Sequence, residues 1–153
     1  MTHILIGWDG SDGARRAVQT AARLMPGSTA TVVTAWRSLV HFGFPALPSV
    51  EAGRRAFDQE AEQASHHLAS QGASHAQECG LQATPATISC EGAYWHGILR
   101  AAQEQHCDVI VMGFQGTSAV KTLVMGSTAH STVQHARIPV MIVPPPPSAP
   151  VEP

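Results

Sequence analysis

The sequence predicts an α/β fold: a five-stranded parallel sheet with helices on both faces. Strand-like and helix-like segments alternate five times along the 153 residues, an order typical of parallel strands joined by helical crossovers. The run VIVM at residues 109–112 is apolar and mostly β-branched, as expected of a strand buried on both faces. Glycines follow this run directly, at the strand end where such sheets bind ligands.

The first predicted unit is a strand followed by a helix. Residues 3–8 form a short apolar run, and Pro26 with Gly27 marks the end of the helix after it. The helix is expected to bury Ala14, Ala17, Val18, Ala21, Leu24 and Met25, which recur at helical spacing. Residues 29–36 are rich in Thr and Val and predict the second strand. Residues 37–48 lack periodicity and predict a long loop.

A long second helix is predicted from about residue 49 to residue 79, with Gly80 after its end. Its buried face is expected to consist of Phe57, Ala61, Ala64 and Leu68, at positions i, i+4, i+7 and i+11. Its polar face is expected to carry Glu51, Arg54, Arg55, Asp58 and Glu62.

The remaining elements complete the alternation. Residues 81–90 alternate weakly and predict the third strand. A third helix is expected to bury Tyr94, Ile98, Leu99 and Ala102, and the fourth strand covers residues 109–112. A short helix over residues 127–136 then leads to the last strand, Val140 to Val143.

The chain length fits one domain, predicted over residues 1–143. The end of the sequence, PPPPSAPVEP at residues 144–153, favours extended polyproline II and predicts a solvated tail. Its PxxP spacing leaves docking to an aromatic groove as an alternative.

Composition excludes several classes of partner. The net charge is −2, and the nine Lys and Arg residues are scattered, which disfavours nucleic acid and anionic membranes. No apolar run approaches the length of a membrane helix, and no secretory leader precedes the first strand, so we expect a cytoplasmic protein. The three cysteines have no CxxC spacing and are expected to be reduced thiols, with a redox-sensing thiol as the alternative.

The glycine-rich segment predicts a phosphate-binding loop. Gly113, Gly116 and the pair Gly126 and Ser127 have the spacing G, two residues, G, nine residues, G-S. Glycines after a strand let backbone amides approach a phosphate, because no Cβ intervenes. The predicted helix from Ser127 adds unpaired amides and a dipole that favours an anion.

Other functional motifs are absent from the sequence. No GxxxxGK[ST] or GxGxxG pattern occurs, so a P-loop or dinucleotide-binding protein is not supported. No GxSxG elbow indicates a serine hydrolase. None of the nine histidines lies three or four positions from another, so no helix carries a two-histidine metal site. A metal site assembled from distant segments stays open as an alternative.

Four segments of the chain resemble the universal stress protein family. Residues 3–11 (HILIGWDGS) resemble its first strand, and residues 107–113 (CDVIVMG) resemble its fourth. Residues 126–143 resemble its closing helix and last strand, and the glycine spacing is its nucleotide-binding signature. The resemblance covers roughly residues 3–143 and implies a Rossmann-like domain of the adenine nucleotide α-hydrolase-like type.

The resemblance also implies a set of binding residues. Asp9 is expected to accept a ribose hydroxyl or help hold a metal ion, with a turn residue as the alternative, and Ala35 is expected beside adenine. Gln115 stands where many members carry arginine, and Lys121 is the loop's one cation, which implies a weaker hold on a triphosphate. Trp8 and Trp36 are expected to pack in the core or sense a base. The predicted nucleotide-binding residues are Gly7, Asp9, Ala35, Met112, Gly113, Gln115, Gly116, Gly126, Ser127 and Thr128.

The function that the resemblance implies is binding of ATP, or of AMP or ADP, by a regulatory module of the stress response. Mg²⁺ is expected only as a companion of the nucleotide, and a homodimer is expected through Val140 to Val143. One alternative is slow ATP hydrolysis or self-phosphorylation on a hydroxyl such as Ser127. The other is a dimeric interaction module that binds no nucleotide.

Overall fold

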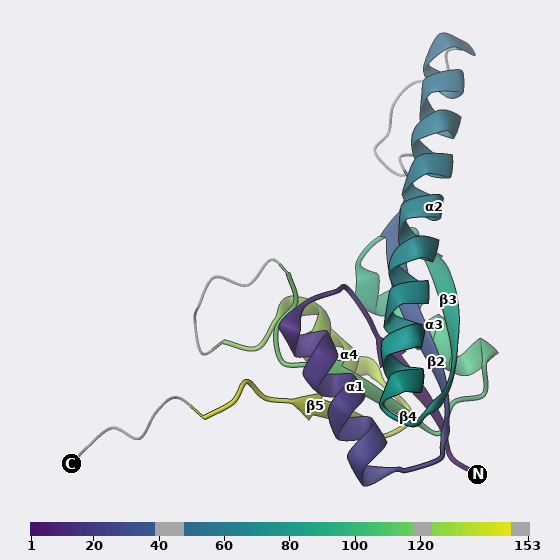
Figure 1. Ribbon diagram of the computed structural model, residues 1–153. Helices are drawn as coiled ribbons and strands as arrows, with labels where there is room; N and C mark the ends of the chain where they lie inside the picture. The colour runs from purple at the N-terminus through teal and green to yellow at the C-terminus, as the bar shows by residue number, and fades with distance from the viewer. Residues whose placement is uncertain (39–47, 118–123, 148–153) are drawn as a thin grey trace.

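Five parallel strands form one sheet with the order β3-β2-β1-β4-β5 (Figure 1). The computed structural model describes residues 1–38, 48–117 and 124–147. Most of the predicted 37–48 loop, Lys121 and the last six residues of the predicted tail lie outside these ranges. The elements are β1 His3–Gly7, α1 Asp12–Leu24, β2 Thr29–Arg37, α2 Pro48–Glu78, β3 Gln82–Cys90, α3 Tyr94–Glu104, β4 Val109–Gly113, α4 Ser127–His135 and β5 Val140–Val143. The predicted fold class is therefore confirmed.

The sheet divides the core into two layers. Alternate residues of β1 point to opposite faces, so Ile4 and Ile6 pack with α1 and α2, whereas Leu5 packs with α3. β4 does the same, with Val111 on the α1 and α2 face and Ile110 on the α3 face. These central side chains are fully buried, which explains why both strands lack polar alternation.

The strand order creates a crevice between β1 and β4. The chain passes from β1 to β2 and β3 in one direction, and then returns to place β4 on the other side of β1. The two neighbouring strands therefore lead to helices on opposite faces of the sheet. In parallel sheets this switch point is the usual place for a ligand, at the carboxyl ends of the strands.

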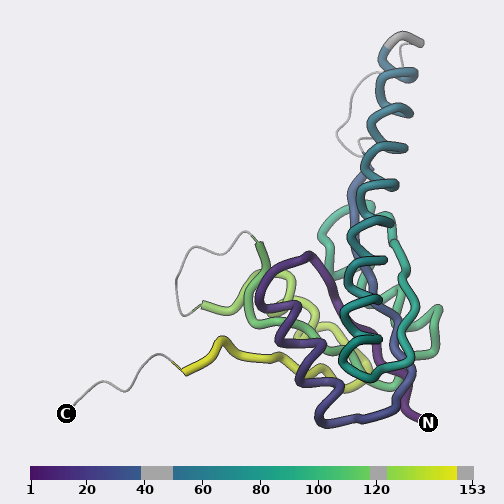
Figure 2. Tube along the Cα trace, in the orientation of Figure 1, coloured from purple at the N-terminus to yellow at the C-terminus, as the bar shows by residue number. Residues whose placement is uncertain are grey.

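Three predicted buried faces need correction. On α3, Tyr94 was expected to be buried but is 37% exposed, at the first position of the helix. Leu24 at the end of α1 is 51% exposed, and on α2 Phe57 is 47% exposed and Ala64 is also exposed. The 31 residues of α2 make a helix roughly 46 Å long, and Figure 2 shows its N-terminal half projecting beyond the sheet. Its buried positions lie further along and are occupied by small residues: Ser65, Ala69, Gly72, Ala73 and Ala76.

The projecting part of α2 carries the predicted charged face. Arg54 pairs with Glu51 and, at 3.2 Å, with Asp58, and Arg55 pairs with Glu51 at 3.1 Å. Hydrogen bonds from Arg54 and Arg55 lower the pKa of Glu51 to about 2. These pairs at helical spacing support a segment of α2 that gains little from core packing.

Helices α2 and α3 each end in a turn of the same type, but a different residue occupies the left-handed position in each turn. After α2, Gly80 has a φ of +94°, and the amides of Gly80 and Leu81 donate to α2 carbonyls. After α3, His106 has a φ of +50°, and His106 and Cys107 make the equivalent bonds. Glycine suits this position because a Cβ is strained there.

We expect His106→Gly to raise the free energy of unfolding by about 0.5–1 kcal/mol, because it removes roughly 1–2 kcal/mol of left-handed strain at some cost in chain entropy. Gly80→Ala is expected to lower it by about 1 kcal/mol, because it introduces the same strain. Urea unfolding of both variants measures the two changes. Destabilisation by His106→Gly would show that the histidine side chain makes a compensating contact.

Candidate functional site

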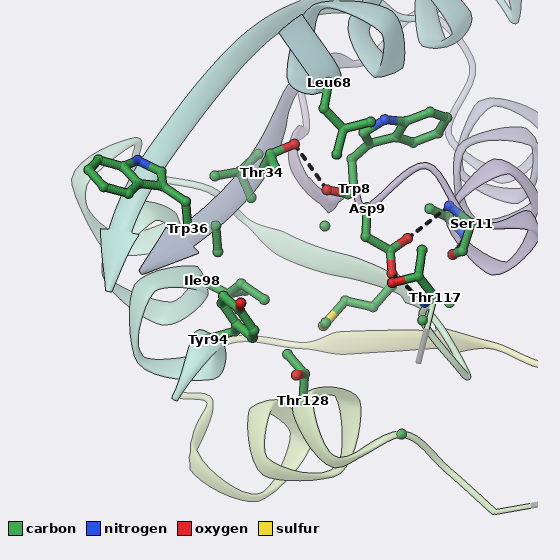
Figure 3. Close-up of a pocket in the computed structure, with 18 of the residues that line it drawn as sticks. Trp8, Asp9, Ser11, Thr34, Trp36, Leu68, Tyr94, Ile98, Thr117 and Thr128 are labelled. Carbon is green, nitrogen blue, oxygen red and sulfur yellow. Dashed lines mark hydrogen bonds between the residues drawn. The ribbon is translucent and has the colours of Figure 1, made fainter. Parts of the chain in front are cut away.

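A cavity of about 660 Å³ lies at the carboxyl ends of β1, β2 and β4 (Figure 3). This volume is typical of small-molecule sites. Helix α2 closes one side, and α3 and the first turn of α4 close the other. The residues predicted to bind a nucleotide all line it: Gly7, Asp9, Ala35, Met112, Gly113, Gln115, Gly116, Gly126, Ser127 and Thr128. The structure thus brings the ten together, while their binding role stays a prediction.

Asp9 connects the segment after β1 to the glycine loop after β4. Its Oδ1 accepts the Ser11 amide at 3.0 Å, and its Oδ2 accepts the Thr117 amide at 3.0 Å (Figure 3). A Cβ at Gly116 would lie 2.5 Å from Asp9 Oδ2. Glycine at this position therefore allows the carboxylate to reach the loop, and Asp9, which lines the cavity, has further lone pairs beyond the two used in these bonds.

Position 113 requires glycine because the backbone of β4 lies in close contact with the backbone of α1 there. A Cβ at Gly113 would lie 2.5 Å from the carbonyl carbon of Gly13, in the first turn of α1. In return, a Cβ at Gly13 would clash with the Gln115 carbonyl oxygen. The two glycines let α1 pack directly on the end of β4. The sequence had suggested ligand approach as the reason for Gly113, and it gave no reason for Gly13.

The N-terminus of α4 faces the cavity with unpaired amides. The Gly126 amide donates to Phe114 O at 2.8 Å, which fixes the start of the helix against the end of β4. The first helical bond runs from His130 to Gly126 O, so Ser127, Thr128 and the residue after them have no intrahelical acceptor for their amides. Gly126 is the N-cap and supplies no side-chain cap. These donors suit an anion.

Gln115 braces the glycine loop. Its Nε2 donates to the Val124 carbonyl at 2.9 Å, which joins the two described ends of the loop. The sequence had placed Gln115 among the ligand contacts, at the position of a phosphate-binding arginine in many relatives. In this structure at least part of its hydrogen-bonding capacity holds the protein's own backbone.

Sequence reasoning missed several lining residues. Arg37 lies at the end of β2, with its guanidinium carbon 4.6 Å from the Tyr94 ring centroid, and both residues line the cavity. Because Arg37 is two positions after Ala35 on a strand, the spacing alone could have indicated that they share a face. Thr34, Ser65 and Leu68 line the opposite side, under α2, to which the sequence had assigned no site residue.

The profile of the universal stress protein family matches residues 1–144. The chain belongs to the universal stress protein family. A universal stress protein of Thermus aquaticus is 32% identical over 143 residues, which cover 92% of this chain and 96% of the relative. Among solved structures, this universal stress protein resembles hypothetical protein MJ0577, with a TM-score of 0.79 and 17% identity over 96% of this chain and 98% of the other.

Three other structures with the same fold contain an adenine nucleotide. One is a universal stress protein in complex with cAMP (TM-score 0.61, 21% identity, 93% of this chain and 96% of the other covered). Another, from Archaeoglobus fulgidus, is in complex with dAMP (0.59, 19%, 93% and 97%). The third, from Arabidopsis thaliana, has AMP bound (0.58, 15%, 94% and 92%). At these identities the likeness of each to this universal stress protein concerns the fold.

The tryptophans of this universal stress protein differ in their surroundings. Trp8 is only 4% exposed and packs under α2, where a Cβ at Gly72 would lie 2.6 Å from its ring. The Trp8 Nε1 is buried and has no hydrogen-bond partner among the described residues. Trp36 is half-buried and also lines the cavity. Trp8 is therefore a core residue as well as part of the cavity wall.

The cysteines of this universal stress protein do not gather at the cavity. Cys90 and Cys107 are buried, and burial raises the pKa of both thiols, that of Cys107 to about 11. Such thiols stay protonated at neutral pH, which disfavours a redox-sensing role for these two. Within residues 1–38, 48–117 and 124–147, no group of three or more His, Cys, Asp or Glu side chains is arranged to hold a metal ion.

Proposed function

We propose that this universal stress protein binds an adenine nucleotide in the cavity and acts as a regulatory binding module. The observation that carries the proposal is the order of groups across the sheet. The amides of Ser127 and Thr128 lie beyond β4, Asp9 follows β1, and Ala35 lies on β2. A nucleotide with its phosphate at α4 would place its ribose near Asp9 and its base over β2. The cAMP, dAMP and AMP complexes of the structural neighbours support this choice of ligand.

The described residues favour a ligand with few phosphates. Arg37 is the only cation among the described residues that line the cavity, and it lies at the end of β2, with its guanidinium over the Tyr94 ring. Among the described residues, backbone amides at the start of α4 are therefore the groups best placed to hold a phosphate. Gln115, unlike an arginine, adds no positive charge to them. We propose AMP as the preferred ligand, with ATP and Mg²⁺ binding more weakly.

Turnover receives less support than binding. Asp9 is the one acid among the described lining residues, which include no lysine or histidine, and both of its oxygens accept amides. Efficient phosphoryl transfer needs a metal, a positioned nucleophile and charge stabilisation of the transferred group. Slow hydrolysis or self-phosphorylation therefore remains the second proposal.

We also propose that residues 1–143 form the nucleotide-binding domain and that the protein acts in the cytoplasm. No helix in the described ranges is both long and apolar enough to cross a membrane.

The ligand can be identified directly. The purified protein is denatured, and the released small molecules are analysed by mass spectrometry. The stripped protein is then titrated with AMP and with Mg-ATP while tryptophan fluorescence is followed, because Trp8 and Trp36 line the cavity. The proposal expects a saturable response, at lower concentration for AMP. No released nucleotide and no response to either ligand would favour the interaction module that binds no nucleotide.

We also propose a homodimer paired through β5. The two edges of the sheet differ: β3 carries Pro85 in its middle, whereas Val140, Met141 and Ile142 of β5 are only half-buried. Proline on an edge strand hinders further pairing, so β5 is the edge better suited to a second copy of the chain.

Ile142→Pro is expected to convert this dimer into a monomer. The carbonyls of Pro139 and Val143 accept amides from β4 and its end, so the alternate residues Val140 and Ile142 direct their backbone groups outward. Proline at 142 removes one outward donor and leaves the pairing with β4 intact. Sedimentation velocity measures the mass, and Ile142→Val, which keeps the amide, is the control. A monomeric wild-type protein would contradict the proposal.

A further inference from the structure

The hydrogen-bond register of β3 identifies the backbone groups that face away from the sheet. β3 lies at one edge of the sheet, beside β2 (Figure 1). The Gln82 amide donates to Ser28 O at 3.0 Å, just before β2. In a parallel strand the amide and carbonyl of one residue point to the same side, and successive residues alternate, so the even-numbered residues of β3 face β2. The outward-facing residues are Ala83, Pro85, Thr87 and Ser89.

Side chains from two helices bind outward carbonyls of β3. Gln77 of α2 donates from Nε2 to Ala83 O at 2.8 Å, near the start of the strand. Arg100 of α3 donates from its guanidinium to Ser89 O, near the end of the strand. The two helices pack on opposite faces of the sheet, so the edge is reached from both sides. A strand added at this edge would have to displace both side chains before its own amides could approach these carbonyls.

Pro85 lies between these two positions and has no amide hydrogen. Because residue 85 faces outward, proline there leaves the hydrogen bonds between β3 and β2 intact. It removes a donor that an added strand would need. The outward backbone of β3 is thus altered at positions 83, 85 and 89, whereas β5, at the other edge of the sheet, contains no proline.

We propose that Gln77, Pro85 and Arg100 close the β3 edge to strand addition, so that a second copy of the chain can extend the sheet only at β5. This inference goes beyond nucleotide binding and adds a limit to the proposed dimer. A dimer paired through β5 carries a β3 edge at each end of its joined sheet. If these edges were open, dimers would add to one another in an open chain. Closed β3 edges end the assembly at two copies.

Sedimentation velocity of the full-length protein tests the inference. The variant Gln77→Ala/Pro85→Thr/Arg100→Ala, called the edge-open variant, restores an outward amide and removes both side chains that bind the carbonyls. All three residues are exposed, so we expect the variant to fold. Its average mass is expected to exceed that of wild type at least about twofold at high concentration, and to rise with concentration, because open edges allow continued addition.

The matched control is Arg23→Ala/Gln71→Ala/Pro85→Thr. It carries the same three kinds of substitution but keeps Gln77 and Arg100. Arg23 lies on α1 and Gln71 lies on α2 beside His67, and both are exposed. This control is expected to keep the wild-type mass, because both outward carbonyls remain bound. Equal masses for the control and the edge-open variant would overturn the inference.

Thr87→Pro, added to the edge-open variant, separates strand pairing from unspecific aggregation. Residue 87 faces outward, so proline there removes an amide from the edge and keeps the bonds to β2. The wild-type mass is expected to return. Continued association would show that something other than backbone pairing drives it, and would also overturn the inference.

AMP titration of the same variants keeps this inference separate from the proposed function. None of the substituted residues is among the described residues that line the cavity, so the affinity for AMP should match that of wild type in each variant. A wild-type protein that binds no AMP would remove the proposed function and leave the test of the β3 edge unchanged. Thermal unfolding confirms that folded proteins are being compared.

Discussion

Gly116→Ala is expected to weaken adenine-nucleotide binding at least about tenfold. The added Cβ would lie 2.5 Å from Asp9 Oδ2, so the carboxylate must leave its position and lose the Thr117 amide. Hydrogen bonds to charged groups contribute about 1.5–3 kcal/mol each, and the displaced carboxylate would lose its contact with the ribose as well. Calorimetric titration with AMP measures the effect.

The control for this variant is Gly92→Ala. Gly92 lies between β3 and α3, is exposed, and does not have a positive φ. A Cβ added at Gly92 would meet no atom within 4 Å, so the affinity of this variant for AMP should match that of wild type. Unchanged affinity in Gly116→Ala would mean that Asp9 and the glycine loop do not bind the nucleotide jointly. The ligand would then have to bind in another part of the cavity.

Gly113→Ala is expected to lower the free energy of unfolding by about 2–3 kcal/mol, and the melting temperature by roughly 5–10 °C. Its Cβ would meet the Gly13 backbone at 2.5–2.8 Å. Backbone on both sides cannot rotate away as a side chain can, so α1 must shift from β4. Urea and thermal unfolding measure the loss.

Gly7→Ala is the matched control for Gly113→Ala. Gly7 ends β1 as Gly113 ends β4, but its Cβ would meet only the Met112 side chain, at 3.5 Å. We expect a change below about 1 kcal/mol. Equal losses in the two variants would contradict the role of Gly113 as a close-packing glycine.

The strands could be predicted because their sequence pattern follows directly from their burial. Residues 109–112 and 140–143 are apolar throughout, and the structure places them in β4 and β5. The glycine spacing likewise places Gly116 and Gly126 at one cavity, because it reflects the local geometry of a strand end and a helix start.

The buried face of α2 could not be predicted in the same way. Its packing positions are filled by alanines such as Ala69 and Ala73, and the sequence gives exposed Ala64 the same side chain. Phe57 seemed to mark the core face, yet it lies in the N-terminal half of α2, is 47% exposed and lines the cavity. How much of a helix packs against its sheet depends on the tertiary structure, so the local sequence does not reveal it.

Contacts between distant segments explain the other omissions. Gly13 is small because it meets Gln115 of the glycine loop, far along the chain, and Arg37 packs on Tyr94 from another element. The Thr34 hydroxyl likewise donates to Trp8 O, which belongs to the segment after β1. No local pattern carries these pairings, so only the folded arrangement reveals them.

Calorimetric titration of the stripped wild-type protein with AMP decides whether the cavity is a nucleotide site. We expect saturable binding of one AMP per chain, retained in Gly92→Ala and lost or strongly weakened in Gly116→Ala. Absence of any heat of binding, with a folded protein confirmed by its melting curve, would refute the assignment of the cavity to an adenine nucleotide.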